Sequence, residues 1–258
     1  MEYYYFLEGN IFITKIYNTN MKPCFTCSNK PMNRSIFKGH LEDFFMKRLP
    51  KNNKCFHDKD GHKLELFDLH PNKTIFYFAT NRSDISKQIN SYVDAYRNLN
   101  NSGIVKVNKN GNATAYLKCP QLYFNTDGKV YSRHMHFLYW DDAKQDWNKT
   151  LYTKQILCNI DKTLFSKYLK KAILVDARPL VNYNKSHIAG AINLPYNKRW
   201  SEASIMDELE RNVGNYDGNK LVPIILYCSK GCDMAYKLYQ KLNTLGFYNT
   251  FQIGENMI

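Results

Sequence analysis

A cysteine between a predicted strand and a predicted helix is the residue of this chain best placed to do chemistry. Cys228 follows the apolar run 221–226 and Tyr227, which together predict a buried strand. Residues 233–245 then repeat apolar side chains at helical spacing, and Gly246 ends the pattern. Cys228 therefore lies in a loop that leaves a strand and opens a helix.

Such a loop provides the conditions for a nucleophile. Backbone N–H groups of a glycine-containing loop converge there, and the positive end of the helix dipole points the same way. Both effects favour the thiolate, so we expect a lowered pKa for the Cys228 thiol. The alternative is a buried structural cysteine, the commoner role of a cysteine beside a strand. The order of strand, loop and helix favours the reactive interpretation.

Two segments upstream of Cys228 resemble the N-terminal half of a rhodanese domain. They are the run 173–178 (ILVDAR) and, after Tyr183, the run 187–195 (HIAGAINLP). Cys228 then falls where that family keeps its sulfur-carrying cysteine. The resemblance covers residues 163–258 and implies an α/β rhodanese-like fold with a central, mainly parallel sheet.

The resemblance also implies roles for individual residues. Asp176, Arg178 and His187 would be structural supports of the sheet and the loop. The substrate-binding loop would comprise Ser229, Lys230, Gly231, Cys232, Asp233 and Met234. The family often has Arg where Asp233 stands and Ser or Thr where Met234 stands, and these departures leave the substrate open.

The implied activity is a two-step sulfur transfer that requires no cofactor. The Cys228 thiolate attacks a small anionic sulfur donor, such as thiosulfate or a persulfide, and becomes a persulfide itself. The sulfur then passes to a nucleophilic acceptor, either a thiol or a protein. Lys230 would hold the anionic donor or would be a solvated loop charge. Cys232 would resolve the persulfide as a disulfide or would pack at the helix start.

Three other functions compete with this one. Phosphatases with a rhodanese-like fold need an arginine six residues after the cysteine, and Met234 stands there instead. A non-catalytic binding or regulatory module, fused to a metal-binding β domain, would not need a reactive cysteine. In a third alternative, the N-terminal domain is a metal-dependent oxygenase or sensor, and the C-terminal domain supplies sulfur to it or removes sulfur from it. The presence of Cys228 favours the sulfurtransferase.

The chain is predicted to have two domains. Strand-like and helix-like segments alternate in residues 163–258, which indicates βαβ units. Residues 1–160 instead carry short strand-like runs separated by Asn- and Gly-rich turns, with a helix expected over 85–99. This pattern predicts a mainly-β, sandwich-like domain with some helix and an unknown function.

A metal site is a second expectation, in the β domain. His134 and His136 are two residues apart, so on a strand they share a face. Cys119, Cys158 or a tyrosine such as Tyr123 or Tyr131 would complete a shell for zinc or iron. The alternative is a pair of cross-strand histidines with no metal.

The order of residues around these histidines resembles the intradiol dioxygenase β-sandwich. It runs from the Asn110-Gly111 turn through Pro120, Tyr123 and the two histidines to the run 151–153. The resemblance implies non-haem iron held by two His and two Tyr, and the tyrosine ligands are not assigned. A separate Cys24-x-x-Cys27 pair with Cys55 and His57 is either a zinc knot or a set of free thiols.

Composition limits the partners and the compartment. The net charge is +13, but the lysines are scattered, so nucleic acid is not an expected partner. No apolar run approaches the ~18–20 residues of a membrane span, and the N-terminus lacks signal-peptide features, so we expect a cytoplasmic protein with no membrane partner. Seven cysteines without secretory features predict thiol or metal chemistry rather than disulfides.

Overall fold

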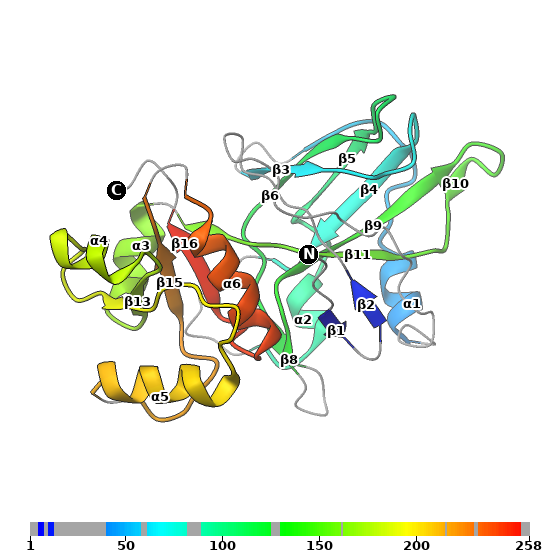
Figure 1. Cartoon of the computed structure of the whole chain (residues 1–258). Helices are drawn as coiled ribbons and strands as arrows, with labels where there is room; N and C mark the ends of the chain where they lie inside the picture. The colour runs from blue at the N-terminus through cyan, green and yellow to red at the C-terminus, as the bar shows by residue number, and fades with distance from the viewer. Residues whose placement is uncertain are drawn as a thin grey trace. The chain divides into compact units, whose positions relative to one another are not determined.

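The computed structural model divides the chain into two compact units, Met1–Ile156 and Leu157–Ile258 (Figure 1). It describes residues 5–7, 10–12, 40–57, 61–81, 89–124, 130–160, 162–214, 216–229 and 232–253. Each unit has its own sheet, and the two are described in turn.

The N-terminal unit is built on antiparallel strands. Its main sheet has the order β10-β9-β4-β5, and β11 also pairs with β9. Smaller pairs are β1–β2, β3–β6 and β7–β8. The elements are β1 (Tyr5–Leu7), β2 (Asn10–Phe12), α1 (His40–Met46), β3 (His62–Leu66), β4 (Thr74–Ala79), α2 (Tyr92–Tyr96), β5 (Ser102–Lys106), β6 (Ala113–Leu117), β7 (Tyr123–Phe124), β8 (Val130–Tyr131), β9 (His134–Asp141), β10 (Asp146–Trp147) and β11 (Tyr152–Gln155).

Helices cover one face of this main sheet. Alternate residues of β4 and β9, including Phe76, Phe78 and Leu138, point into one core cluster. Phe45 of α1 and Tyr96 of α2 pack into the same cluster, with their rings 5.0 Å apart. The unit is therefore β-rich as expected, and on this face α1 and α2 close the core together with Tyr123 of the short β7–β8 pair.

The helix expected over residues 85–99 is shorter in the structure. Helix α2 begins after Ser91, whose hydroxyl accepts a hydrogen bond from the backbone N–H of Asp94, and it ends at Tyr96. Arg97 and Leu99 both have positive φ, so the backbone leaves the helical region there. Residues 85–88 of the expected helix lie outside the described part of the chain.

The C-terminal unit is a five-stranded parallel sheet with the order β12-β16-β15-β13-β14. The alternation of strand and helix along the chain produces this arrangement, because parallel neighbours need a crossover connection. The elements are β12 (Asn159–Ile160), α3 (Lys162–Leu169), β13 (Ile173–Asp176), α4 (Leu180–Lys185), β14 (Ile192–Asn193), α5 (Glu202–Asn212), β15 (Ile224–Tyr227), α6 (Met234–Thr244) and β16 (Thr250–Ile253).

The register of this sheet positions the candidate site. Strands β13 and β15 are neighbours, and Asp176 at the end of β13 is paired with Tyr227 at the end of β15. Helix α6 begins shortly after β15 and packs against β15 and β16 (Figure 1). The carboxyl ends of β13 and β15 therefore meet at one sheet edge, where ligands of open α/β sheets commonly bind.

None of the helices in the described ranges is both long enough and apolar enough to cross a lipid bilayer.

Candidate active site around Cys228

Cys228 directly follows β15, the central strand of the parallel sheet, and its side chain is buried. Its Sγ donates a hydrogen bond to the backbone carbonyl of Cys232 at 3.0 Å. The backbone N–H of Cys232 in turn donates to the carbonyl of Ser229 at 3.0 Å, which closes a turn. The predicted loop residues Lys230 and Gly231 lie outside the described residues.

The protonation of Cys228 is decided by two opposing effects. Burial raises the pKa of its thiol to about 12, because a thiolate would lose its hydration there. The backbone N–H groups of Ala235 and Met234 act to lower that pKa, while the Cys232 side chain raises it further. The expected lowering of the pKa is therefore wrong for this conformation, because desolvation outweighs the helix N-terminus.

The remaining predicted loop residues lie at the start of α6. Asp233 immediately precedes the helix, and its carboxylate forms an ion pair with Lys237 one turn along, at 2.7 Å. Met234 is the first helical residue, and its backbone N–H donates to Cys232 Sγ at 3.4 Å. Backbone groups therefore contact both sulfurs: the Cys232 carbonyl accepts from Cys228, and the Met234 N–H donates to Cys232.

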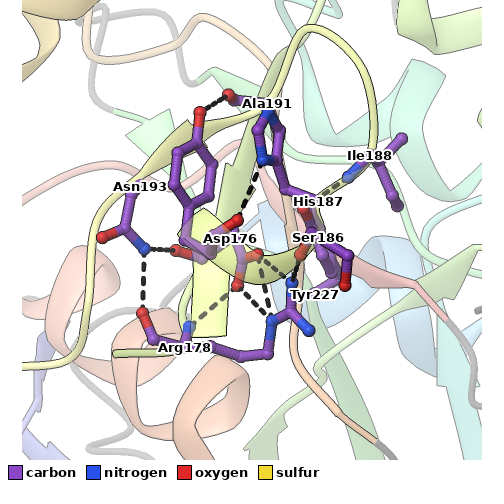
Figure 2. A network of polar contacts seen from close by, with 9 residues as sticks. Asp176, Arg178, Ser186, His187, Ile188, Ala191, Asn193 and Tyr227 are labelled. Atoms are coloured by element: carbon purple, nitrogen blue, oxygen red, sulfur yellow. Dashed lines mark hydrogen bonds and ion pairs between the residues drawn. The ribbon is translucent and has the colours of Figure 1, made fainter. Parts of the chain in front are cut away.

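Asp176 and Arg178 support the neighbouring strand end. The fully buried Asp176 carboxylate pairs with the Arg178 guanidinium at 2.6 Å and accepts the backbone N–H of Arg178 at 2.9 Å. Arg178 also donates to the carbonyl of Ser186 at 2.6 Å (Figure 2). This network ties the end of β13 to the segment that follows α4.

A second set of contacts connects that segment to the strand of Cys228. The Tyr227 hydroxyl accepts the backbone N–H of Ile188 at 3.0 Å, and burial raises its pKa to about 12 (Figure 2). His187 stacks on Tyr183, with ring centroids 4.0 Å apart, and its Nδ1 donates to the Tyr183 carbonyl at 3.0 Å. His187 therefore contacts Tyr183 of α4, whereas the hydrogen bond between the segment after α4 and strand β15 is made by Tyr227.

Sequence reasoning missed Tyr227 and Asn193. The Asn193 side-chain amide donates to the carbonyls of Asp176 and Arg178, at 3.1 and 2.8 Å. Tyr227 directly precedes the predicted nucleophile, and this position is the one feature of the sequence that points to a role at the site. Both residues connect neighbouring strands or the segments that follow them. Their contacts form only once β13 has paired with β14 and β15, so the sequence alone does not reveal them.

The two histidines of the N-terminal unit lie together on β9 as predicted, with ring centroids 4.8 Å apart. The Ser132 carbonyl at 2.6 Å can only accept, so His134 Nδ1 carries the proton and Nε2 accepts from the Tyr96 hydroxyl at 2.9 Å. Burial lowers the pKa of His134 to about 4. His136 Nδ1 lies 2.8 Å from the Thr153 hydroxyl. Tyr96 was not among the predicted residues.

This cluster does not match the expected zinc or iron shell. Cys119 and Cys158 each take part in a disulfide, so neither supplies a thiolate, and the expectation of free thiols is wrong for both. Tyr96 holds His134 Nε2, the atom that would face the metal. Within the described ranges, no three His, Cys, Asp or Glu side chains lie close enough to share a metal ion. Cys24 and Cys27 lie outside those ranges.

Comparison with known families concerns the C-terminal unit. Residues 162–254 match the rhodanese-like domain, so this part of the chain is a rhodanese-like α/β domain. None of the curated proteins matches the chain significantly. The resemblance of the N-terminal unit to intradiol dioxygenases stays a prediction.

Two solved structures resemble part of the chain. An uncharacterized protein from Saccharomyces cerevisiae is 23% identical with a TM-score of 0.29, over 39% of this chain and 88% of that one. The 3-mercaptopyruvate sulfotransferase SseA from Escherichia coli, described as having the rhodanese fold, is 25% identical with a TM-score of 0.27. That match covers 38% of this chain and 40% of the length of SseA.

Proposed function

We propose that the C-terminal unit is a sulfurtransferase domain in which Cys228 carries sulfane sulfur as a persulfide. One observation carries the proposal: Cys228 directly follows the central strand, and its sulfur contacts the Cys232 carbonyl just before α6, where backbone N–H groups of the first helical turn act to lower the pKa of its thiol. Such N–H groups stabilise an anion at this place, as either a thiolate or a persulfide. The rhodanese-like match of residues 162–254 supports the same class of reaction.

The reaction has two steps that balance at sulfur. The Cys228 thiolate attacks the outer sulfur of the donor, so a new S–S bond forms and the donor's own S–S bond breaks. With thiosulfate the leaving group is sulfite. A nucleophilic acceptor then attacks the outer sulfur of the persulfide and restores the Cys228 thiolate.

The first step requires a change at the loop. Sγ of Cys228 now donates to the Cys232 carbonyl, and a thiolate cannot make that hydrogen bond. Loss of the thiol proton therefore requires the carbonyl of Cys232 to move away and the N–H groups to take over. We expect this rearrangement of the loop to occur when the sulfur donor binds.

The raised pKa of Cys228 favours one competing function, a non-catalytic binding or regulatory module. With a pKa of about 12, burial keeps almost all of the thiol protonated at neutral pH. A module that only binds a partner would need no change from this state. The two functions therefore differ in whether a sulfur donor modifies Cys228.

Mass spectrometry after incubation with a donor separates the two. We expect thiosulfate or a low-molecular-weight persulfide to add one sulfur atom at Cys228, and Cys228→Ser to abolish thiosulfate:cyanide sulfur transfer. Cys55→Ser is the matched control, because Cys55 is an exposed free cysteine in the N-terminal unit. Full activity in Cys228→Ser would mean that another residue carries the sulfur. An unmodified Cys228 with both donors would leave the binding module as the function.

A further inference from the structure

Two thiols meet at the carboxyl end of β15. The backbone N–H of Met234 donates to Cys232 Sγ at 3.4 Å, and the Cys232 carbonyl accepts a hydrogen bond from Cys228 Sγ at 3.0 Å. Cys232 therefore contacts the Cys228 sulfur through its carbonyl, while its own sulfur lies at the start of α6. The neighbouring Cys232 side chain also acts to raise the pKa of the Cys228 thiol.

Two hydrogen bonds hold Cys232 close to the residues that follow β15. Its backbone N–H donates to the Ser229 carbonyl at 3.0 Å, and its own carbonyl accepts from Cys228 Sγ at 3.0 Å. A disulfide needs Cα atoms roughly 4.4–6.8 Å apart, which an extended five-residue segment would far exceed. The two hydrogen bonds show that Cys232 does not lie at the far end of an extended segment.

The two sulfurs differ in their surroundings. Cys228 is buried at the strand end, whereas Cys232 is partly exposed, and both are free cysteines. Within the described residues, the third free cysteine, Cys55, belongs to the other unit. Cys232 is thus the thiol that the C-terminal unit itself places beside Cys228.

We propose that Cys232 is a second catalytic residue, a resolving thiol that discharges the Cys228 persulfide as sulfide. This inference rests on the proposed sulfur-carrying role of Cys228 and names an acceptor for it within the same loop.

The step balances without an external oxidant. Cys232 loses its proton and attacks the inner sulfur, Cys228 Sγ, so the Cys228–Cys232 S–S bond forms and the bond to the outer sulfur breaks. The outer sulfur leaves as hydrosulfide and takes up the electron pair of the broken bond. It is reduced from sulfane sulfur to sulfide, while the two cysteine thiols become a disulfide. A small thiol or dithiol reductant then restores both thiols for another cycle.

The test measures sulfite and sulfide in a single turnover of the full chain with thiosulfate, with no added thiol or cyanide. Sulfite reports the loading of Cys228, and sulfide reports its discharge. We expect equal amounts of both from the natural protein, together with a Cys228–Cys232 disulfide on peptide mapping. Cys232→Ser and Cys232→Ala should release sulfite, keep the added sulfur on Cys228 and lose sulfide release down to background. Cys55→Ser should behave as the natural protein does.

The possible failures are distinguishable. If Cys232→Ser is loaded and the natural protein holds its persulfide equally long without sulfide, Cys232 has no resolving role and the sulfur-carrier function stands. If neither protein releases sulfite or gains sulfur, and a low-molecular-weight persulfide also fails to load them, both proposals are overturned. Sulfide release that persists in both Cys232 variants would likewise reject the resolving thiol.

Discussion

The buried carboxylate of Asp176 is held by both the backbone and the guanidinium of Arg178, only two residues further along the chain. The pairing fixes the turn after β13 and, through the Arg178 contact with Ser186, the segment that reaches Tyr227. The strand end that carries Cys228 is therefore supported from its neighbour.

Removal of Arg178 should destabilise the C-terminal unit. Arg178→Met leaves the Asp176 carboxylate buried without its cation, and we expect a loss of about 3 kcal/mol in the free energy of unfolding. Urea denaturation followed by far-UV circular dichroism measures it. Arg211→Met is the matched control: its pair with Glu208 is largely exposed, so its loss should cost less than about 1 kcal/mol. Equal losses in the two variants would contradict the supporting role of Arg178.

Alkylation of Cys228 should be slow at neutral pH and accelerate with alkali. Burial raises the pKa of this thiol, so the reactive thiolate fraction grows about tenfold per pH unit up to about pH 12. Iodoacetamide labelling at several pH values, quantified peptide by peptide, measures this rate. Cys55 is exposed, so its labelling rate in the same sample shows how fast a cysteine reacts when burial does not limit the reagent. A Cys228 rate that is fast and flat from pH 7 to 9 would show a lowered pKa instead.

The N-terminal unit should lose stability in mild acid because of His134. Burial lowers its pKa from 6.5 to about 4 in the folded state, so the unfolded chain binds a proton more readily between these values. The stability associated with neutral His134 is complete above about pH 6.5 and is lost as the pH falls towards 4, by about 3 kcal/mol. Burial lowers the pKa of His136 as well, which adds in the same direction.

Urea denaturation at pH 7 and pH 4.5 tests this dependence, with the fluorescence of Trp140 and Trp147 in the core of that unit as the signal. His134→Gln should show a smaller difference between the two pH values than the natural protein. His57→Gln, at an exposed position stacked on Tyr116, should keep the full difference. An unchanged difference in His134→Gln would mean that other groups cause the acid sensitivity.

Phosphatase activity should be negligible. The clamp on a phosphoryl group needs an arginine fork, and Met234 occupies the position six residues after Cys228. We expect p-nitrophenyl phosphate to be hydrolysed no faster by the natural protein than by Cys228→Ser, with a cysteine phosphatase as the positive control. A substantial rate that vanishes in Cys228→Ser would show that another residue supplies the clamp.

Regular patterns along the chain predicted most strands and the longer helices. The sequence predicts a strand over 113–117 and a helix over 202–211, and β6 (Ala113–Leu117) and α5 (Glu202–Asn212) match these bounds within a residue, because alternation and amphipathic spacing are visible locally. Helix α4 was missed, since its six residues bury none of their side chains and carry no apolar stripe. The extended prediction over 85–99 failed at its C-terminal end, where Arg97 adopts positive φ.

The sequence predicts which residues form the candidate site, but it does not predict the pKa of Cys228. The family resemblance located Cys228, Asp176 and Arg178, and the structure places Asp176 and Arg178 in one network at the neighbouring strand end. The pKa of Cys228 depends on how deeply the loop buries its sulfur, which no local pattern records. Likewise, the disulfides of Cys119 and Cys158 depend on which cysteines the fold brings together, and the sequence count alone predicted thiols.

The position of β16 in the parallel sheet constrains the order in which this unit can mature on a ribosome. Strand β16 lies between β12 and β15, so Thr250–Ile253 separates the first strand of the unit from the strand that carries Cys228. Until those residues leave the exit tunnel, one edge of β15 stays unpaired and β12 has no partner in the sheet. The N-terminal unit can fold earlier during synthesis, whereas the sheet around Cys228 is complete only after β16 has been made.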